Sequence, residues 1–232
     1  MSGFVFKQFK VDHDQCAMKV STDGILLGAW AQLTTGQRIL DIGTGTGLLA
    51  LMCRQRAANT CVHAVEIDES AYLQAKQNIA ASPWPDIVIY KQSIQHFKTN
   101  SPFDVVISNP PYFNASLKGQ DLARNTARHT DNLSFSELIT AFKHLSHQNA
   151  FLNVILPCPE AQLFIAQAQL QGLYLVRHCL VQTTATKAPS RSLMCFAYQM
   201  QECELTSLTI HGQGAQYSDE YIALCKDFYL KM

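Results

Sequence analysis

Short apolar runs alternate with amphipathic segments along most of the chain. The apolar runs predict strands at residues 38–42, 62–66, 87–90, 103–108, 150–156, 173–182 and 193–200. The amphipathic segments predict helices at residues 22–33, 48–56, 70–80, 134–147, 160–171 and 219–229. Such alternation is typical of a mostly parallel sheet covered by helices on both faces. The last two strands follow each other without a helix, which predicts an antiparallel pair joined by a polar loop at residues 183–192.

The first 33 residues are expected to form an N-terminal cap and a helix. An extended cap is indicated by the aromatic and apolar residues near the start, Phe4, Phe6, Phe9 and Val11. Ser21 or Thr22 can cap the helix that follows, and Asp23 suits its first turn because acidic side chains stabilise helix N-termini. With a core at residues 34–232, we expect a single domain over residues 1–232, an ordinary length for an α/β domain.

Composition narrows the classes of protein. The chain has 18 Lys and Arg against 18 Asp and Glu, so its overall charge does not indicate a nucleic-acid binder, although a local basic patch would be enough. The spacing of its 8 cysteines matches neither a zinc knuckle nor a CxxC motif, which favours reduced thiols in a cytoplasmic protein. Charges interrupt any signal peptide, and no apolar stretch reaches the ~18–20 residues of a membrane span. His144 and His147 have no evident third ligand, so we expect no metal site.

A glycine turn follows the first strand of the predicted sheet, in the sequence Asp-Ile-Gly-Thr-Gly-Thr-Gly of residues 41–47. Glycines allow a tight turn and let a ligand approach the backbone closely. Leu48 stands where the dinucleotide fingerprint has its third glycine, which argues against a dehydrogenase. The spacing is instead similar to that of S-adenosylmethionine-dependent methyltransferases. The candidate cofactor-binding residues in this turn are Asp41, Gly43, Thr44, Gly45 and Gly47.

A carboxylate ends the next strand, where Glu66 is followed by Ile67 and Asp68. A carboxylate here can accept hydrogen bonds from both hydroxyls of a ribose, and a solvated acid at a strand end is the alternative. We expect Glu66 and Ile67 to belong to the cofactor site and Asp68 to cap the following helix. Ser93, after the third strand, stands where such methyltransferases often have a polar group for the adenine amine of the cofactor.

The motif Asn109-Pro110-Pro111-Tyr112 directly follows the buried strand at residues 103–108. Proline fixes φ, has no N–H and restricts the residue before it, so the backbone here is rigid. The Asn109 side chain and the Pro110 carbonyl can accept hydrogen bonds from the two hydrogens of an amine, and Tyr112 can stack on a flat ring. The motif therefore predicts a catalytic socket for the exocyclic amine of an aromatic base; a rigid structural turn is the alternative.

These motifs, in this order, resemble class I methyltransferases that modify amino groups. Residues 9–11 (Phe-Lys-Val), 19–30 (beginning Lys-Val-Ser-Thr-Asp-Gly) and 127–130 (Ala-Arg-His-Thr) are similar to the bacterial tRNA1(Val) adenine-37 N6-methyltransferase family. The resemblance implies a Rossmann-like α/β fold, a seven-stranded and mostly parallel sheet with one antiparallel strand near an edge. It also implies methyl transfer from S-adenosylmethionine to N6 of an adenine beside the anticodon of a tRNA, which would be the partner.

Other functions share parts of this pattern. Class I methyltransferases commonly have an aspartate at the position of Ser93.

The chain has no large insertion for DNA recognition, which argues against a DNA methyltransferase. Its N-terminal part is too short for the helical domain of release-factor glutamine methyltransferases, which also carry Asn-Pro-Pro-Tyr. An rRNA guanine-N2 methyltransferase is an alternative because its substrate amine fits the same socket. A non-catalytic, cofactor-loaded RNA-binding module is another.

Two basic segments are candidates for contacting RNA phosphates, with solvated charged loops as the alternative. One segment follows the socket motif and the other lies in the loop at residues 183–192. The RNA-binding candidates are Lys118, Arg124, Arg128, His129, Lys187 and Arg191. Lys19 and Thr22 are candidates for a position near the cofactor carboxylate, because the helix that precedes the first strand can cover the cofactor. The sequence indicates no membrane partner and does not define an oligomeric state.

Overall fold

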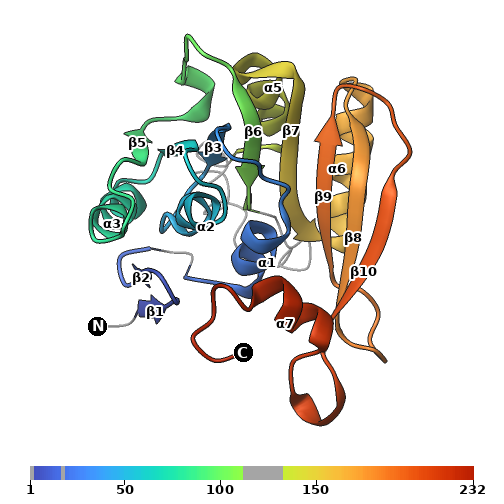
Figure 1. Cartoon of the computed structure of the whole chain (residues 1–232). Helices are drawn as coiled ribbons and strands as arrows, with labels where there is room; N and C mark the ends of the chain where they lie inside the picture. The colour runs from blue at the N-terminus through green and yellow to red at the C-terminus, as the bar shows by residue number, and fades with distance from the viewer. Residues whose placement is uncertain (1–2, 17–18, 112–132) are drawn as a thin grey trace, which may run out of the picture.

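The computed structural model describes residues 3–16, 19–111 and 133–232. At its centre, eight strands of the described residues form one sheet (Figure 1). Within this sheet β9 runs antiparallel to both neighbours, and every other pairing is parallel. From one edge to the other, the strands are β10 (Glu204–His211), β8 (Tyr174–Thr184), β9 (Arg191–Ala197), β7 (Ser146–Pro157), β6 (Phe103–Ser108), β3 (Arg38–Ile42), β4 (Cys61–Glu66) and β5 (Val88–Lys91).

The α/β fold with one antiparallel strand is confirmed, and the sheet has one strand more than the sequence predicts. This additional strand is β10, which pairs in parallel with β8 at an edge of the sheet. In β10 the Leu208 side chain is buried, whereas Leu205 is 67% exposed. An edge strand that buries so few residues has no continuous apolar run, so its sequence carries little signal.

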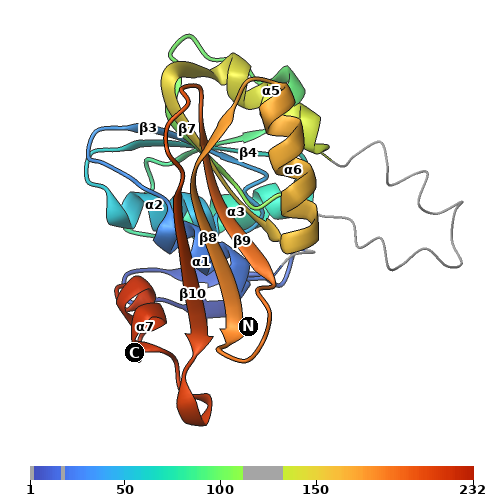
Figure 2. The same ribbon diagram turned by 90° about the vertical axis from the view of Figure 1, so that its right-hand side faces the viewer.

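Helices cover both faces of the sheet (Figure 2). The core that contains Ile39 and Ile107 also contains residues of α1 (Thr22–Trp30), α2 (Leu48–Arg56), α3 (Glu69–Ala80) and α7 (Asp219–Cys225). On the opposite face, α5 (Phe135–Leu145) and α6 (Cys158–Leu170) pack in the core that contains Leu40 and Val106. Neighbouring residues of a strand thus face different cores, as a pleated strand requires. None of the helices in the described parts of the chain has the length and apolar character needed to cross a membrane.

Capping residues begin three helices where the sequence indicates. The side chain of Ser21 accepts a backbone N–H at the start of α1, and that of Asp68 does so at the start of α3. Ser134 and Glu137 form a complete capping box at the start of α5. The helix predicted at residues 134–147 ends earlier, at Leu145, because β7 begins directly after it.

The N-terminal segment is extended, as expected, and forms a small antiparallel sheet of β1 (Gly3–Val5) and β2 (Lys10–Asp12). The rings of Phe6 and Phe9 stack with their centroids 4.6 Å apart. The backbone N–H of Lys7 donates to the carbonyl of Phe228 (2.8 Å), and Phe6 forms a β-bridge with Tyr229. The first and last described segments of the chain therefore lie together (Figure 1).

Candidate functional site

The carboxyl ends of the central strands meet at one edge of the sheet. The registers of β3 with β4 and with β6, continued just beyond the strand ends, place Gly43 beside Glu66 and Asn109. Paired strands lie about 4.8 Å apart, so the glycine turn, the carboxylate and the socket motif share one edge. The Ser108 hydroxyl donates to the carbonyl of Ile42 (2.8 Å), which ties β6 to β3 at this point.

The glycine turn is held by the end of β4. The backbone N–H groups of Gly43 and Thr44 donate to the carbonyl of Val65, at 2.9 and 3.2 Å. Gly43, Gly45 and Gly47 have φ values of +70°, +57° and +83°, a region that favours glycine. A Cβ atom would meet nothing within 4 Å at Gly43 or Gly45. The turn therefore leaves open space beside its backbone, as a ligand that approaches closely would need.

Asp41 lies beneath this turn and has no exposed surface. Its Oδ2 atom accepts hydrogen bonds from the Thr44 hydroxyl and from the backbone N–H of Ala50. Burial raises the pKa of its carboxyl to about 7, although both hydrogen bonds act in the opposite direction. Asp41 is a candidate cofactor residue, and in the structure its buried carboxylate holds the turn through Thr44 and Ala50.

The raised pKa of Asp41 gives a testable pH dependence. The unfolded chain loses this proton near pH 4 and the folded protein near pH 7, so the carboxyl's contribution to stability is complete below pH 4 and declines as the pH rises toward 7. One pKa unit corresponds to about 1.4 kcal/mol. Between pH 4 and 7, the free energy of unfolding of the wild type should therefore fall by at least about 1 kcal/mol more than that of Asp41→Asn. Urea titrations at both pH values measure this, with exposed Asp86→Asn as the control; parallel pH profiles would contradict the assignment.

Glu66 is mostly buried and joins two parts of the site. Its Oε2 atom accepts from the backbone N–H of Gly45 (2.8 Å), and its Oε1 atom accepts from those of Ile67 (2.8 Å) and Asp68 (2.9 Å). The carboxylate is therefore fixed in position by backbone donors. Oε2 makes one of these bonds and keeps capacity to accept another from a ligand.

A cavity of about 530 Å³ opens beside Glu66, within the size range of small-molecule sites. Of the expected cofactor residues, Gly43, Glu66, Ile67 and Ser93 line it. Asp41, Thr44, Gly45, Gly47, Thr22 and Lys19 are not part of its lining, and the last two are exposed side chains. Sequence reasoning missed the remaining lining residues, which are Ile42, Val65, Gln92, Ile94, Gln95, His96, Leu133, Ser134 and Glu137.

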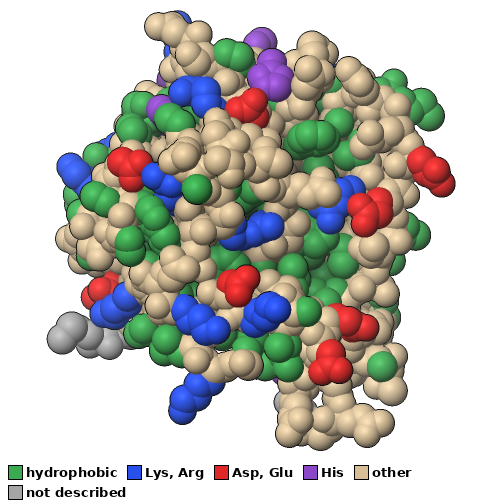
Figure 3. All heavy atoms as spheres, in the orientation of Figure 1, with side chains coloured by type: hydrophobic (Ala, Val, Ile, Leu, Met, Phe, Trp, Pro, Cys, Tyr) green, Lys and Arg blue, Asp and Glu red, His purple; other side chains and the backbone are tan. Residues whose placement is uncertain are grey.

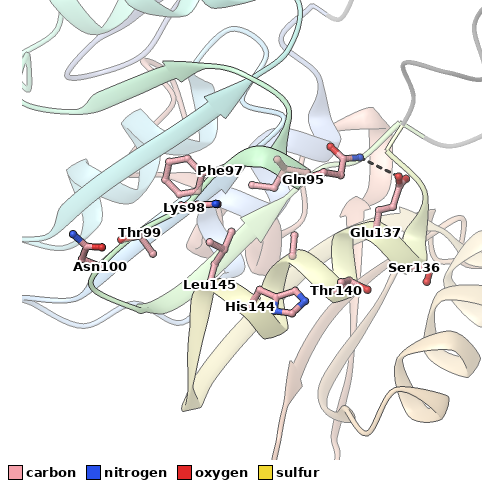
Figure 4. A pocket seen from close by; sticks show the side chains of 12 residues that line it. Gln95, Phe97, Lys98, Thr99, Asn100, Ser136, Glu137, Thr140, His144 and Leu145 are labelled. Carbon is pink, nitrogen blue, oxygen red and sulfur yellow. Dashed lines mark hydrogen bonds between the residues drawn. The ribbon is translucent and has the colours of Figure 1, made fainter.

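A second cavity of about 630 Å³ adjoins the first, between α5 and the 3-10 helix η1 (Ile94–His96) (Figure 4). Gln95 and Glu137 line both cavities, and the Gln95 side-chain amide donates to the Glu137 carboxylate (3.0 Å). His144 lines this second cavity, whereas His147 contacts Asp104 through Nε2 (2.9 Å). No group of three or more potential metal ligands occurs within residues 3–16, 19–111 and 133–232.

The socket motif is described as far as Pro111. Asn109 is half-buried, Pro110 is buried and Pro111 is exposed, directly after β6. Tyr112 lies outside the described residues, and so do four RNA-binding candidates, Lys118, Arg124, Arg128 and His129.

The other two RNA-binding candidates lie near the hairpin between β8 and β9. Lys187 is exposed in its turn. Arg191 donates through Nε to the Asp23 carboxylate (2.8 Å), so this guanidinium links the hairpin to the start of α1. On the face in Figure 3, the described Lys and Arg side chains are interspersed with Asp and Glu, in keeping with the balanced overall charge.

The N-terminal segment supports the glycine turn through a residue that sequence reasoning missed. Asn78 of α3 donates through Nδ2 to the carbonyls of Asp12 and Thr46, at 2.9 Å each. The pKa of Cys16 in the same segment is raised to about 11, first by burial and then by the nearby Glu66 carboxylate. Asn78 is buried, so its amide needs these partners, and no local sequence pattern marks it in advance.

Comparisons with known proteins agree with this geometry. A family model described as "Methyltransferase small domain" matches residues 20–133. A tRNA1(Val) (adenine(37)-N6)-methyltransferase of Pseudoalteromonas translucida is 62% identical over 232 residues, covering 100% of both chains. One of Phocaeicola vulgatus is 47% identical, covering 99% of this chain and 98% of its own.

Solved structures share the fold at low sequence identity. A protein of Agrobacterium tumefaciens described as a predicted O-methyltransferase has a TM-score of 0.67 and 18% identity, covering 89% of this chain and 96% of its own. A methyltransferase of Pyrococcus furiosus has a TM-score of 0.56 and 20% identity, covering 76% and 81%. At these identities the likeness concerns the class I methyltransferase fold alone.

Proposed function

This chain belongs to the tRNA1(Val) (adenine(37)-N6)-methyltransferase family, and we propose that it transfers a methyl group from S-adenosylmethionine to N6 of adenine 37 in tRNA1(Val). The 62% identity over the whole chain carries this proposal. The site supports it, because Asn109 follows β6 on one side of the glycine turn and Glu66 ends β4 on the other. Hydrogen-bond acceptors for an amine and a site for a nucleoside thus lie at the same edge of the sheet.

The residues of the first cavity suit the cofactor. Open space at Gly43 and Gly45 allows a ligand to approach the turn, and Glu66 Oε2 can accept from a ribose hydroxyl. Ser93 lies beyond β5, the strand next to β4, and lines the same cavity as Glu66, which supports a contact with the base when the ribose is at Glu66. The bound cofactor would supply a methyl group on a sulfonium, from which a neutral thioether leaves readily. Thr44, Gly45, Gly47 and Asp41 would act by holding the turn.

The socket would select and position the amine. The N6 lone pair of adenine is delocalised into the ring, which makes this nitrogen a poor nucleophile. Hydrogen bonds from its two hydrogens to the Asn109 side-chain oxygen and the Pro110 carbonyl favour a more pyramidal nitrogen. These acceptors bind more strongly as the nitrogen gains positive charge, so they stabilise the transition state over the ground state. Tyr112 would stack on the base.

Nucleoside analysis tests the proposed reaction. The protein is incubated with labelled S-adenosylmethionine and with tRNA from a strain that lacks this gene. We expect label in N6-methyladenine, and none when adenine 37 of a tRNA1(Val) transcript is replaced by guanine. Label in N2-methylguanine would contradict the proposal and favour a guanine-N2 methyltransferase.

Lys187 is proposed to contact an RNA phosphate. Arg191 pairs with Pro157, the last residue of β7, so the hairpin turn that carries Lys187 extends past the carboxyl edge of the sheet. Lys187→Ala should weaken tRNA binding and reduce the salt dependence of log K by ~0.7 to 0.9, the value for one lost phosphate contact. Titrations at several salt concentrations measure this, with Lys143→Ala at the end of α5 as a control. An unchanged slope would exclude the contact.

A further inference from the structure

A chain of hydrogen bonds runs along one wall of the cofactor cavity, from η1 to α5. The Ser93 hydroxyl donates to Gln95 Oε1 (2.5 Å), and Gln95 Nε2 donates to Glu137 Oε1 (3.0 Å), the bond drawn in Figure 4. Glu137 Oε2 in turn accepts from the backbone N–H (2.8 Å) and the hydroxyl (2.7 Å) of Ser134. All four residues line the cavity that contains Glu66.

The chemistry of Glu137 sets the direction of this chain. Hydrogen bonds from the Ser134 hydroxyl, the Ser134 backbone and Gln95 lower the pKa of its carboxyl, so it is ionised and can only accept. Gln95 must therefore turn its NH₂ group toward Glu137 and its carbonyl oxygen toward Ser93. The hydroxyl hydrogen of Ser93 is then directed to Gln95, which leaves lone pairs facing the cavity.

We infer that Gln95 and Glu137 are positioning residues that make Ser93 an acceptor and thereby set a preference for an amino over an oxo group on the cofactor's purine. This inference rests on the proposed function, in which the adenosyl group occupies the cavity. The 6-amino group of adenine donates hydrogen bonds, whereas a 6-oxo group accepts them. To bind an oxo group, the Ser93 hydroxyl must rotate and give up its bond to Gln95. The Ser93 hydroxyl, which by itself can accept or donate a hydrogen bond, is thus restricted by Gln95 and Glu137 to accepting one from the purine.

Binding of two cofactor products tests the inference without tRNA and without turnover. S-adenosylhomocysteine carries the amino group, and S-inosylhomocysteine carries an oxo group in its place. Calorimetry on the wild-type protein should give about fivefold tighter binding of the adenosyl compound, the effect of one hydrogen bond in the middle of the usual range. The effect is modest because Gln95 and Glu137 are exposed side chains.

Glu137→Gln is the decisive variant. Glutamine preserves the capping box of α5, so the helix should still begin at the same place. Its NH₂ group can donate to Gln95, which then turns its own NH₂ group toward Ser93 and makes Ser93 a donor to the cavity. The ratio of the affinities for S-adenosylhomocysteine and S-inosylhomocysteine should fall to about 1 or below. Adding Ser93→Asp to this variant should restore the preference for the adenosyl compound, because an ionised carboxylate can only accept hydrogen bonds, in either orientation of the Gln95 amide.

His144→Gln serves as the matched control, because it changes a residue of the same helix that lines the second cavity but not the first. This variant should keep the wild-type ratio of the two affinities. Equal binding of the two compounds by the wild type, or an unchanged ratio in Glu137→Gln, would overturn the inference and leave the proposed function standing. If neither compound binds the wild type, the proposed function fails together with the inference.

Discussion

Asn109→Ala should lower kcat by about 100-fold or more and leave the affinity for S-adenosylhomocysteine within about twofold of wild type. The loss corresponds to one acceptor that acts on charge developing in the transition state. Asn109 lies beside the glycine turn at the end of β6 and is absent from the lining of the cavity beside Glu66, which is why the two properties should separate. Single-turnover methylation of tRNA measures the chemical step, and calorimetry measures cofactor-product binding.

Two further variants sharpen the Asn109 experiment. Asn109→Asp keeps a side-chain acceptor and should retain more activity than Asn109→Ala. Asn149→Ala, at the opposite end of the sheet near the start of β7, should change neither kcat nor the affinity for S-adenosylhomocysteine. Near-normal turnover in Asn109→Ala would refute the socket and leave its prolines as a structural turn.

Glu66→Gln should weaken cofactor-product binding roughly 100-fold, as expected for two hydrogen bonds to a charged group at about 1.5 kcal/mol each. The amide that replaces the carboxylate can accept at one atom, so it cannot satisfy Gly45, Ile67, Asp68 and a ribose together. Glu69→Gln, at an exposed position nearby, is the matched control.

An analogue that lacks the ribose 2′-hydroxyl separates a direct contact from a loss of structure. Removal of the hydroxyl should weaken binding to the wild type and have less effect in Glu66→Gln, because the contact is already lost there. If removal of the 2′-hydroxyl weakens binding equally in the wild type and in Glu66→Gln, Glu66 organises the turn without contacting the ribose. Thermal unfolding of the variant shows how much of the loss comes from the fold itself.

The parts predicted from sequence are those with a local cause. β3, β6 and α2 have the predicted bounds, because both sheet faces are covered and the buried segments read as continuous apolar runs ended by glycine, proline or a change of period. The caps at Ser21, Asp68 and Ser134 are local as well, since each capping side chain and the backbone N–H that donates to it lie three residues apart. The glycine turn and Glu66 meet because parallel strands end at one edge.

The parts that were missed depend on contacts between distant residues. Arg191 is an RNA-binding candidate, and its ion pair with Asp23 joins residues 168 apart in the sequence, which no local pattern indicates. Glu137 completes the capping box of α5, and its place in the cavity wall follows from how α5 packs beside η1. Asp41 carries the residue type of a ligand contact, and only its burial shows that it faces inward. Local pattern sets residue type and element, whereas packing decides which way a side chain points.

The joining of the two ends of the chain has a consequence for how the protein is made. Lys7 bonds through Nζ to the carbonyl of Lys226, 219 residues later, and its backbone pairs with Phe228. During synthesis the N-terminal segment emerges first and must wait for these partners, because the chain is made from the N-terminus onward and they are among its last residues. The segment that Asn78 fastens to the glycine turn thus gains its second attachment only late in synthesis. Ribosome-bound chains stalled before residue 226 should therefore hold the cofactor less tightly than the released protein.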